Sequence, residues 1–364
     1  MSLLGNITLE RTYYYCPTCQ AGYSPTDVAL SLAQTHFTPA ATEVICIAGV
    51  ETSFAVASEV TLVKLCGLRV SESTVERTTE KVGQQLGERL AAKETFGAEQ
   101  AWEWERDAHG HTCAYVGADA TGIRQQGDHG AQAEGRMAYV GMVYNPRGAS
   151  ETAQRKPARI VRNVRYLAGF YALDELGLQL RRQAAQVGID QVEQQLALSD
   201  GGSGLEDFFR KNFPRAEHIL DFWHAKEYLV ELSQTLFGAG AAAGQSWLDE
   251  RCQQLKHEGG AAVLATLEAL DVSQHSEAVR DKLQSTITYY RNHQHKMDYP
   301  RYLANGWQIG SGPVESACNT VVNQRLAGPG RRWGEPGSDA VCHLRALYRS
   351  EPSQWESFWH WQPS

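Results

Sequence analysis

Apolar side chains between residues 111 and 222 form short continuous runs rather than a helical spacing. The runs TCAYVGADATGI (112–123), RMAYVGMVYN (136–145) and ARIVRNVRYLAG (158–169) are typical of buried strands, and the first is predicted to end at Asp119. A helix over about 173–187 follows, then a strand ending at Asp200, a glycine-rich turn, a helix, and a short strand that becomes a helix near Phe222. This alternation predicts an α/β layer structure, in which sites gather where strands end.

Two other segments show helical spacing, with apolar residues three and four apart. Residues 39–99 predict two short helices, a tight turn at Gly67, and a third helix opened by a Ser73–Glu76 capping box. This outline fits a helix-turn-helix-like DNA-binding region and equally a plain helical connector, because the third helix carries glutamates as well as Arg77 and Lys81. Residues 223 to about 296 predict an all-α insertion with breaks at FGAGAAAGQ and HEGG.

These patterns divide the chain into five parts. They are a strand-and-turn segment (1–38), a helical region (39–108), the first part of a sheet domain (109–222), the all-α insertion (223–304), and the last part of the sheet domain (305–364). The predicted fold class is therefore α/β, interrupted by an all-α insertion.

Composition narrows the class of protein. The chain has 364 residues, 42% of them hydrophobic, with neither a run of 18 apolar residues nor a basic-then-apolar start, so we expect no membrane span and no secretory signal. Eight widely spread cysteines fit a reducing cytoplasm better than a disulfide scaffold.

The formal net charge is −8, yet basic residues cluster locally. One cluster lies between Asn145 and Tyr166, and a second follows Arg325. Such strips are compatible with phosphate contacts, although solvated arginines on an ordinary surface explain the charge equally well.

Cys16 and Cys19 form a CxxC turn near the start of the chain. Tetrahedral zinc takes four Cys or His ligands, so this pair is half of a zinc site that other residues would have to complete. Two free thiols in a turn, or a redox pair, are the alternatives.

Three carboxylates stand out by their order along the chain. Asp119 and Asp200 follow predicted strands, and Glu315 lies in the first turn of a late helix, for which Gly312 is the expected N-cap and Pro313 the first residue. Taken singly, each fits a turn or a helix dipole. Together, three converging carboxylates can hold two Mg²⁺ or Mn²⁺ ions for phosphodiester displacement.

The words around these residues resemble a known family. GADATG, LSDGGSGL, ILDFWHAKEYL and NGWQIGSGPVESACNTVVNQRLAGPGRRW resemble DDE transposases with an RNase H-like fold, of the ISKra and Mutator-like group of insertion sequences. The resemblance covers about residues 13–349, and the block around Glu315 is its most specific part.

The resemblance implies a role for each matching residue. Asp119, Asp200 and Glu315 would be the catalytic, metal-binding triad, and Asp221 with His224 would match a D-x-x-H signature in which His224 contacts DNA or orients the site. The alternative for His224 is a core histidine bonded to Asp221. The residues expected to contact DNA are Arg159, Arg162, Arg165, Arg325, Arg331, Arg332 and Trp333.

The resemblance also implies partners. They are double-stranded DNA, at least one further copy of the chain on that DNA, and no membrane, which places the protein in a prokaryotic cytoplasm at the nucleoid. Relatives carry further cysteines before the CxxC, so either the start is truncated here or a separate upstream reading frame supplies them. An inactive or domesticated DNA-binding derivative and a related metal-dependent nuclease are the alternatives, while a two-carboxylate glycosidase is disfavoured.

Overall fold

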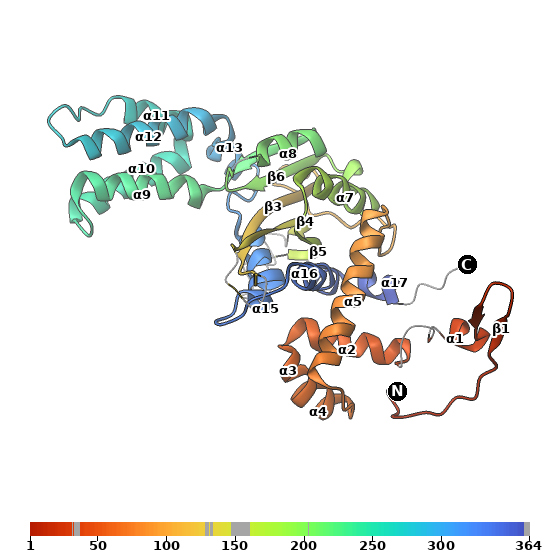
Figure 1. The fold of residues 1–364 in the computed structure, drawn as a ribbon. Coiled ribbons are helices and arrows are strands. Elements are labelled where there is room, and N and C mark those ends of the chain that lie inside the picture. Colours follow the sequence, from red (N-terminus) through yellow and green to blue (C-terminus); the bar gives the residue numbers. More distant parts are fainter. Residues whose placement is uncertain are drawn as a thin grey trace.

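A five-stranded mixed sheet lies between the helical insertion and the N-terminal helices (Figure 1). In this computed structural model, which describes residues 1–30, 32, 37–127, 131, 134–146, 161–202 and 204–359, the strand order is β5-β4-β3-β6-β7. Within this sheet, β3, β4 and β5 pair antiparallel. Strand β6 pairs parallel to β3, and β7 pairs parallel to β6. The strands are β3 (Cys113–Ile123), β4 (Arg136–Pro146), β5 (Val161–Gly169), β6 (Gln194–Ser199) and β7 (Ala216–Leu220). The predicted α/β class is confirmed.

Both faces of this sheet are covered, which explains the continuous apolar runs of its strands. Side chains alternate along a strand, so Ala114, Val116 and Ala118 join one core with α7 (Leu173–Gln186) and α8 (Leu205–Asn212). Cys113 and Tyr115 point to the opposite face and join a second core with the helices that follow the insertion. Asp119 belongs to this second face by the same alternation.

The all-α insertion leaves the sheet after β7 and projects away from it (Figure 1). Its breaks fall at Gly238 and Gly259, inside the two predicted segments. The backbone N–H of Phe222 donates to Ile309 O at 2.8 Å, so the chain returns to the point where it left. The insertion comprises α9 (Phe222–Phe237), α10 (Ala242–Glu258), α11 (Gly260–Glu268), α12 (Glu277–His293), a 3₁₀ turn (Gln294–Lys296) and α13 (Tyr299–Ala304).

The last part of the chain is helical. It runs through α14 (Gly312–Ala317), a π-helical turn (Cys318–Asn323), α15 (Gln324–Leu326), α16 (Glu335–Arg349) and α17 (Pro352–Trp359). The helix stops before Gly328 and Pro329, as predicted. Within the described ranges, no helix is both long and apolar enough to cross a membrane.

The N-terminal helices α2 (Pro39–Glu51) and α5 (Glu72–Ala91) pack against α16, which itself packs against β5 of the sheet. Between them lie α3 (Phe54–Val56), a π turn (Ala57–Thr61) and α4 (Leu62–Cys66), and the predicted turn at Gly67 is left-handed. The predicted Ser73–Glu76 capping box is wrong, because α5 begins after Ser71, whose hydroxyl contacts the hydroxyls of Ser73 and Thr74. Helix α5 packs tightly on α16: a Cβ on Gly83 would lie 2.2 Å from Ala340 O. A role of these helices in binding DNA remains a prediction.

Candidate active site

Asp119 lies on β3, and Asp200 follows directly after the neighbouring strand β6. The parallel register pairs Cys113 with Gln194 and Gly117 with Leu198, and its continuation by two residues brings Asp119 level with Asp200. The expectation that the first strand ends at Asp119 is wrong, because β3 continues to Ile123 by pairing with β4 alone. Asp119 therefore lies two residues beyond the last position at which β3 pairs with its parallel neighbour β6.

The carboxyl group of Asp119 is half-buried and held by two short-range contacts. The N–H of Ala120 donates to its Oδ1 at 2.7 Å, and the Cys318 thiol donates to its Oδ2 at 3.6 Å. Burial raises the pKa of Asp119 above its usual value, and the negative charges of Asp200 and Glu315 raise it further. The three carboxylates that the sequence singled out are thus electrostatic neighbours.

Helix α14 reaches the sheet because β3 carries a glycine at the point of contact. A Cβ on Gly117 would lie 2.3 Å from Cγ2 of Val314, so any larger residue would displace the helix. Four residues further along β3, the Thr121 hydroxyl donates to Asn323 Oδ1 at 2.9 Å. Gly117 and Thr121 flank Asp119 on the same face of β3, so the carboxylate lies beneath this helix.

Glu315 is oriented by a serine that precedes its helix. The N-cap of α14 is Ser311, one residue before the expected Gly312, and Pro313 is the second residue of the helix. The Ser311 hydroxyl lies 2.9 Å from Oε1 of Glu315 and also contacts Oδ2 of Asp221. Because a hydroxyl has one proton, it serves one carboxylate at a time.

Asp221 links this helix to the start of the insertion. Its Oδ1 accepts the backbone N–H groups of Trp223 and His224, and its Oδ2 accepts the N–H of Ser311. The side chain is only 1% exposed, so these bonds replace water entirely. Asp221 is therefore a structural residue that caps α9 and fixes the loop before Glu315.

The structure rules out one of the two roles expected for His224. The core-histidine alternative is wrong, because its side chain is 36% exposed and only its backbone bonds to Asp221. The imidazole Nδ1 lies 3.3 Å from Oε2 of Glu227. A contact between His224 and DNA remains a prediction.

Ser311 and Cys318 belong to the site but were not selected from the sequence. Their signal was their spacing, since Ser311 precedes Glu315 by one helical turn and Cys318 follows it by three residues. The π-helical turn that begins at Cys318 directs its thiol to Asp119.

The carboxylates suit a hard cation by their donor chemistry. Asp200 uses Oδ1 to accept the N–H of Gly202 at 2.8 Å, and Glu315 uses Oε1 for Ser311, which leaves Asp200 Oδ2 and Glu315 Oε2 for other ligands. Within the described part of the chain, however, no group of three or more His, Cys, Asp or Glu side chains is placed to hold a metal ion. Carboxylate oxygens are the donors that Mg²⁺ and Mn²⁺ prefer, but these oxygens would have to draw together around an ion, so a metal here remains a prediction.

Several residues expected to contact DNA lie inside the protein, which corrects those predictions. Arg165 is fully buried and pairs with Glu351. Arg325 is 3% exposed, with its guanidinium 4.5 Å from the ring centroid of Phe54 and 4.8 Å from that of Trp333, which is itself buried. Burial is the main cause that lowers the pKa of Arg325, to about 9.

The remaining basic candidates have different positions. Arg332 is exposed, and Arg331 is half-exposed and donates to Arg325 O. Arg159 and the side chain of Arg162 lie outside the described residues. Of the predicted DNA contacts, only Arg331 and Arg332 are described on the surface.

The CxxC motif forms the turn of a hairpin. Cys16 ends strand β1 (Tyr14–Cys16), and Cys19 lies in the turn before β2 (Ala21–Tyr23), which α1 (Pro25–Ala29) follows; both thiols are exposed and free. The backbone N–H of Cys19 is the main cause that lowers the pKa of Cys16, which favours the metal-binding thiolate. Neither cysteine belongs to a three-ligand group in the described ranges, so zinc remains a prediction.

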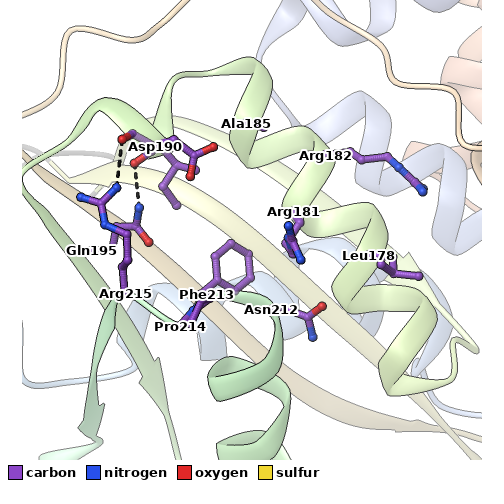
Figure 2. A pocket seen from close by; sticks show the side chains of 11 residues that line it. Leu178, Arg181, Arg182, Ala185, Asp190, Gln195, Asn212, Phe213, Pro214 and Arg215 are labelled. Atoms are coloured by element: carbon purple, nitrogen blue, oxygen red, sulfur yellow. Dashed lines mark hydrogen bonds between the residues drawn. The ribbon is translucent and has the colours of Figure 1, made fainter.

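A separate pocket of about 400 Å³ lies at the other end of β6, beside Gln195 (Figure 2). Arg181 and Arg182 line it from α7, and Arg215 is held by the carbonyl oxygens of Asp190 and Val192. Since Asp200 follows the opposite end of this strand, the pocket is not part of the carboxylate site.

Compared with models of known protein families, the chain matches none, and no curated protein matches it either.

Proposed function

We propose that the chain is a DDE-type DNA transposase that cleaves transposon ends and joins them to target DNA. The observation that supports this proposal is the placement of Asp119 on β3, Asp200 directly after the neighbouring strand β6, and Glu315 in the first turn of a much later helix, near enough that the charges of Asp200 and Glu315 raise the pKa of Asp119. A mixed sheet interrupted by a helical insertion between its last strand and the glutamate helix supports the RNase H-like fold that the sequence resembles.

Asp119, Asp200 and Glu315 would hold two Mg²⁺ or Mn²⁺ ions. When bound, such ions supply the charge that activates a water or a DNA 3′-hydroxyl and stabilises the leaving oxygen. The chain itself provides the orientation: Ala120 and Cys318 hold Asp119, Gly202 holds Asp200, and Ser311 holds Glu315. Preorganised side chains of this kind reduce the reorganisation that the reaction would otherwise require.

The proposed partner is double-stranded DNA. The exposed Arg332, in the loop after the glutamate helix, supports a phosphate contact there. Cutting two ends in one complex requires at least a dimer, and the activity places the protein at the nucleoid of a prokaryotic cytoplasm. A zinc ion at Cys16 and Cys19, completed by further ligands, belongs to the same proposal.

A related metal-dependent nuclease is the second candidate, because the same three carboxylates serve hydrolysis without joining. The two candidates differ in one product. A transposase links a cleaved 3′ end to a second DNA, whereas a nuclease leaves only free ends.

The test uses the full chain, Mg²⁺ or Mn²⁺, and labelled duplexes taken from both flanks of its reading frame. We expect cleavage and joining by the wild type, and a loss of at least about 1,000-fold in Asp119→Asn, Asp200→Asn and Glu315→Gln with DNA binding retained. Glu250→Gln, on the exposed side of α10, is the matched control. Undiminished cleavage by the three site variants would refute the assignment.

A further inference from the structure

The pocket beside Gln195 lies between α7, the 3₁₀ turn Ile189–Gln191 and the end of α8 (Figure 2). Its volume of about 400 Å³ is within the range of cavities that bind small molecules. Helix α8 ends close to α7 because Gly177 carries no side chain: a Cβ there would lie 2.2 Å from Nδ2 of Asn212. Close packing of the two helices thus forms one wall. The apolar side chains that line the cavity are Leu178, Ile189, Phe213 and Pro214.

Arg215 is a positive charge held in place at this pocket. Its Nη1 donates to Asp190 O at 3.0 Å, and its Nη2 donates to Val192 O at 3.1 Å. Carbonyl oxygens orient the guanidinium without cancelling its charge, and they use only two of the five N–H groups that an arginine offers. Because the guanidinium is already ordered, an anion can bind it without the entropic cost of fixing a flexible side chain.

Two further guanidinium groups line the pocket from α7. Arg181 is exposed and Arg182 is half-buried, and neither has a carboxylate or carbonyl partner in the described part of the chain. Among the described lining residues, Asp190 carries the one carboxylate, so the positive groups exceed the negative ones by two. A phosphate dianion matches this excess, and guanidinium groups bind phosphate oxygens through paired N–H bonds.

We propose that this pocket binds a free organic phosphate of nucleotide size, with the phosphate group at Arg215 and Arg181. The backbone of a duplex binds through its charge and needs no apolar wall, so the apolar lining favours a small molecule over DNA. The carboxylate of Asp190 adds an acceptor for a hydroxyl or amino group of the ligand. The pocket lies at the opposite end of β6 from Asp200, so the inference goes beyond the proposed function and does not depend on it.

The test measures binding of adenosine 5′-diphosphate to the full chain by isothermal titration calorimetry, with a chelator present so that no metal bridges the nucleotide to the carboxylates. We expect saturable binding, and pyrophosphate should bind at least about tenfold more weakly because it leaves the apolar walls uncovered. Arg215→Gln should weaken binding of the nucleotide about 10- to 100-fold, and Arg181→Gln about 10-fold. Since Arg181 has no partner to lose among the described residues, its substitution tests binding without disturbing the fold.

Arg210→Gln is the matched control, because it removes the same charge from an exposed position on α8 outside the pocket, and it should bind the nucleotide as the wild type does. Absence of nucleotide binding by the wild type would overturn the proposal, as would an equal loss in Arg210→Gln and Arg181→Gln. A third arm adds duplex DNA of unrelated sequence. Displacement of the nucleotide by this duplex, with duplex binding weakened in Arg181→Gln, would assign the pocket to DNA and overturn the proposal as well.

Discussion

Asp221 and Ser311 are hydrogen bonded to each other across 90 residues of sequence. One carboxylate thereby caps the first helix of the insertion and fixes the loop after its last helix. Because Ser311 also contacts Glu315, the orientation of the third carboxylate depends on a bond that closes the insertion.

Ser311→Ala tests this dependence. Loss of the hydroxyl frees the Glu315 side chain, so we expect the cleavage rate to fall about 10- to 100-fold. The free energy of unfolding should fall by only about 1–2 kcal/mol, since the backbone bond to Asp221 remains. Rates on labelled DNA and urea denaturation measure the two effects. Ser316→Ala is the control, and an unchanged rate in Ser311→Ala would show that Ser311 does not orient Glu315.

Gly117→Ala tests the close approach of α14 to β3. The new methyl group would overlap Val314, so we expect a loss of about 1–3 kcal/mol in the free energy of unfolding together with reduced cleavage. Gly122→Ala on the same strand is the matched control, because its Cβ would meet only Met137 Sδ, at 3.8 Å. Urea denaturation of both variants gives the comparison. Equal stability of the two would mean that this contact adapts freely.

Two adjacent tyrosines of α12 predict opposite effects of the same substitution. The buried Tyr289 hydroxyl has no hydrogen-bond partner among the described residues, whereas the Tyr290 hydroxyl donates to Ala225 O at 2.9 Å. Tyr290→Phe should therefore lose about 1 kcal/mol of stability, and Tyr289→Phe should lose none or gain about 1 kcal/mol. Thermal and urea denaturation decide the order. A clear destabilisation by Tyr289→Phe would show that its hydroxyl is bonded in solution.

The pair of Glu206 and Lys296 predicts a pH dependence of stability. Lys296 is 2% exposed, and its hydrogen bond is the main cause that lowers the pKa of Glu206 from near 4.5 to about 2. A carboxyl group whose pKa is depressed by folding stabilises the protein above its unfolded pKa and loses that effect as the pH falls through its folded pKa. Because Glu206 itself is half-exposed, solvent screens the pair, and Glu206→Gln should be less stable than the wild type by only about 1 kcal/mol above pH 5.

This difference should shrink between pH 4.5 and pH 2, which urea denaturation at stepped pH can follow. Asp207→Asn is the neighbouring control, because its pair with Arg210 is exposed on both sides. A stability gap in Glu206→Gln that is constant with pH would assign the loss to packing rather than charge.

The strands and the insertion were predictable from sequence because their signals are local. Apolar runs mark buried strands, and the breaks at Gly238 and Gly259 need no knowledge of distant residues. The predicted end of β3 was wrong because pairing with β4 extends the strand beyond Asp119. The residues of one strand do not show how far its partner extends.

The sequence predicted the three acidic residues of the candidate site but not the residues that surround them. The order of Asp119, Asp200 and Glu315 is visible along the chain, whereas the fate of Arg325 depends on partners far away. Its guanidinium donates to Gly49 O, 276 residues earlier, and lies against Phe54 and Trp333. An arginine in a sequence is expected on the surface because it is charged. A buried arginine that packs between two aromatic rings is therefore not predicted from the charge pattern.

The meeting of Phe222 with Ile309, beside the pair of Asp221 and Ser311, makes the helical insertion a module with a single closed base. The entropic cost of closing a loop rises only with the logarithm of its length. Lengthening or shortening this module therefore changes the free energy of folding little, as long as the contacts at its base are retained. Evolution could therefore exchange the helices for others of different reach while the carboxylates keep their places. The hydrogen bonds at the base are the part of the insertion that must be kept.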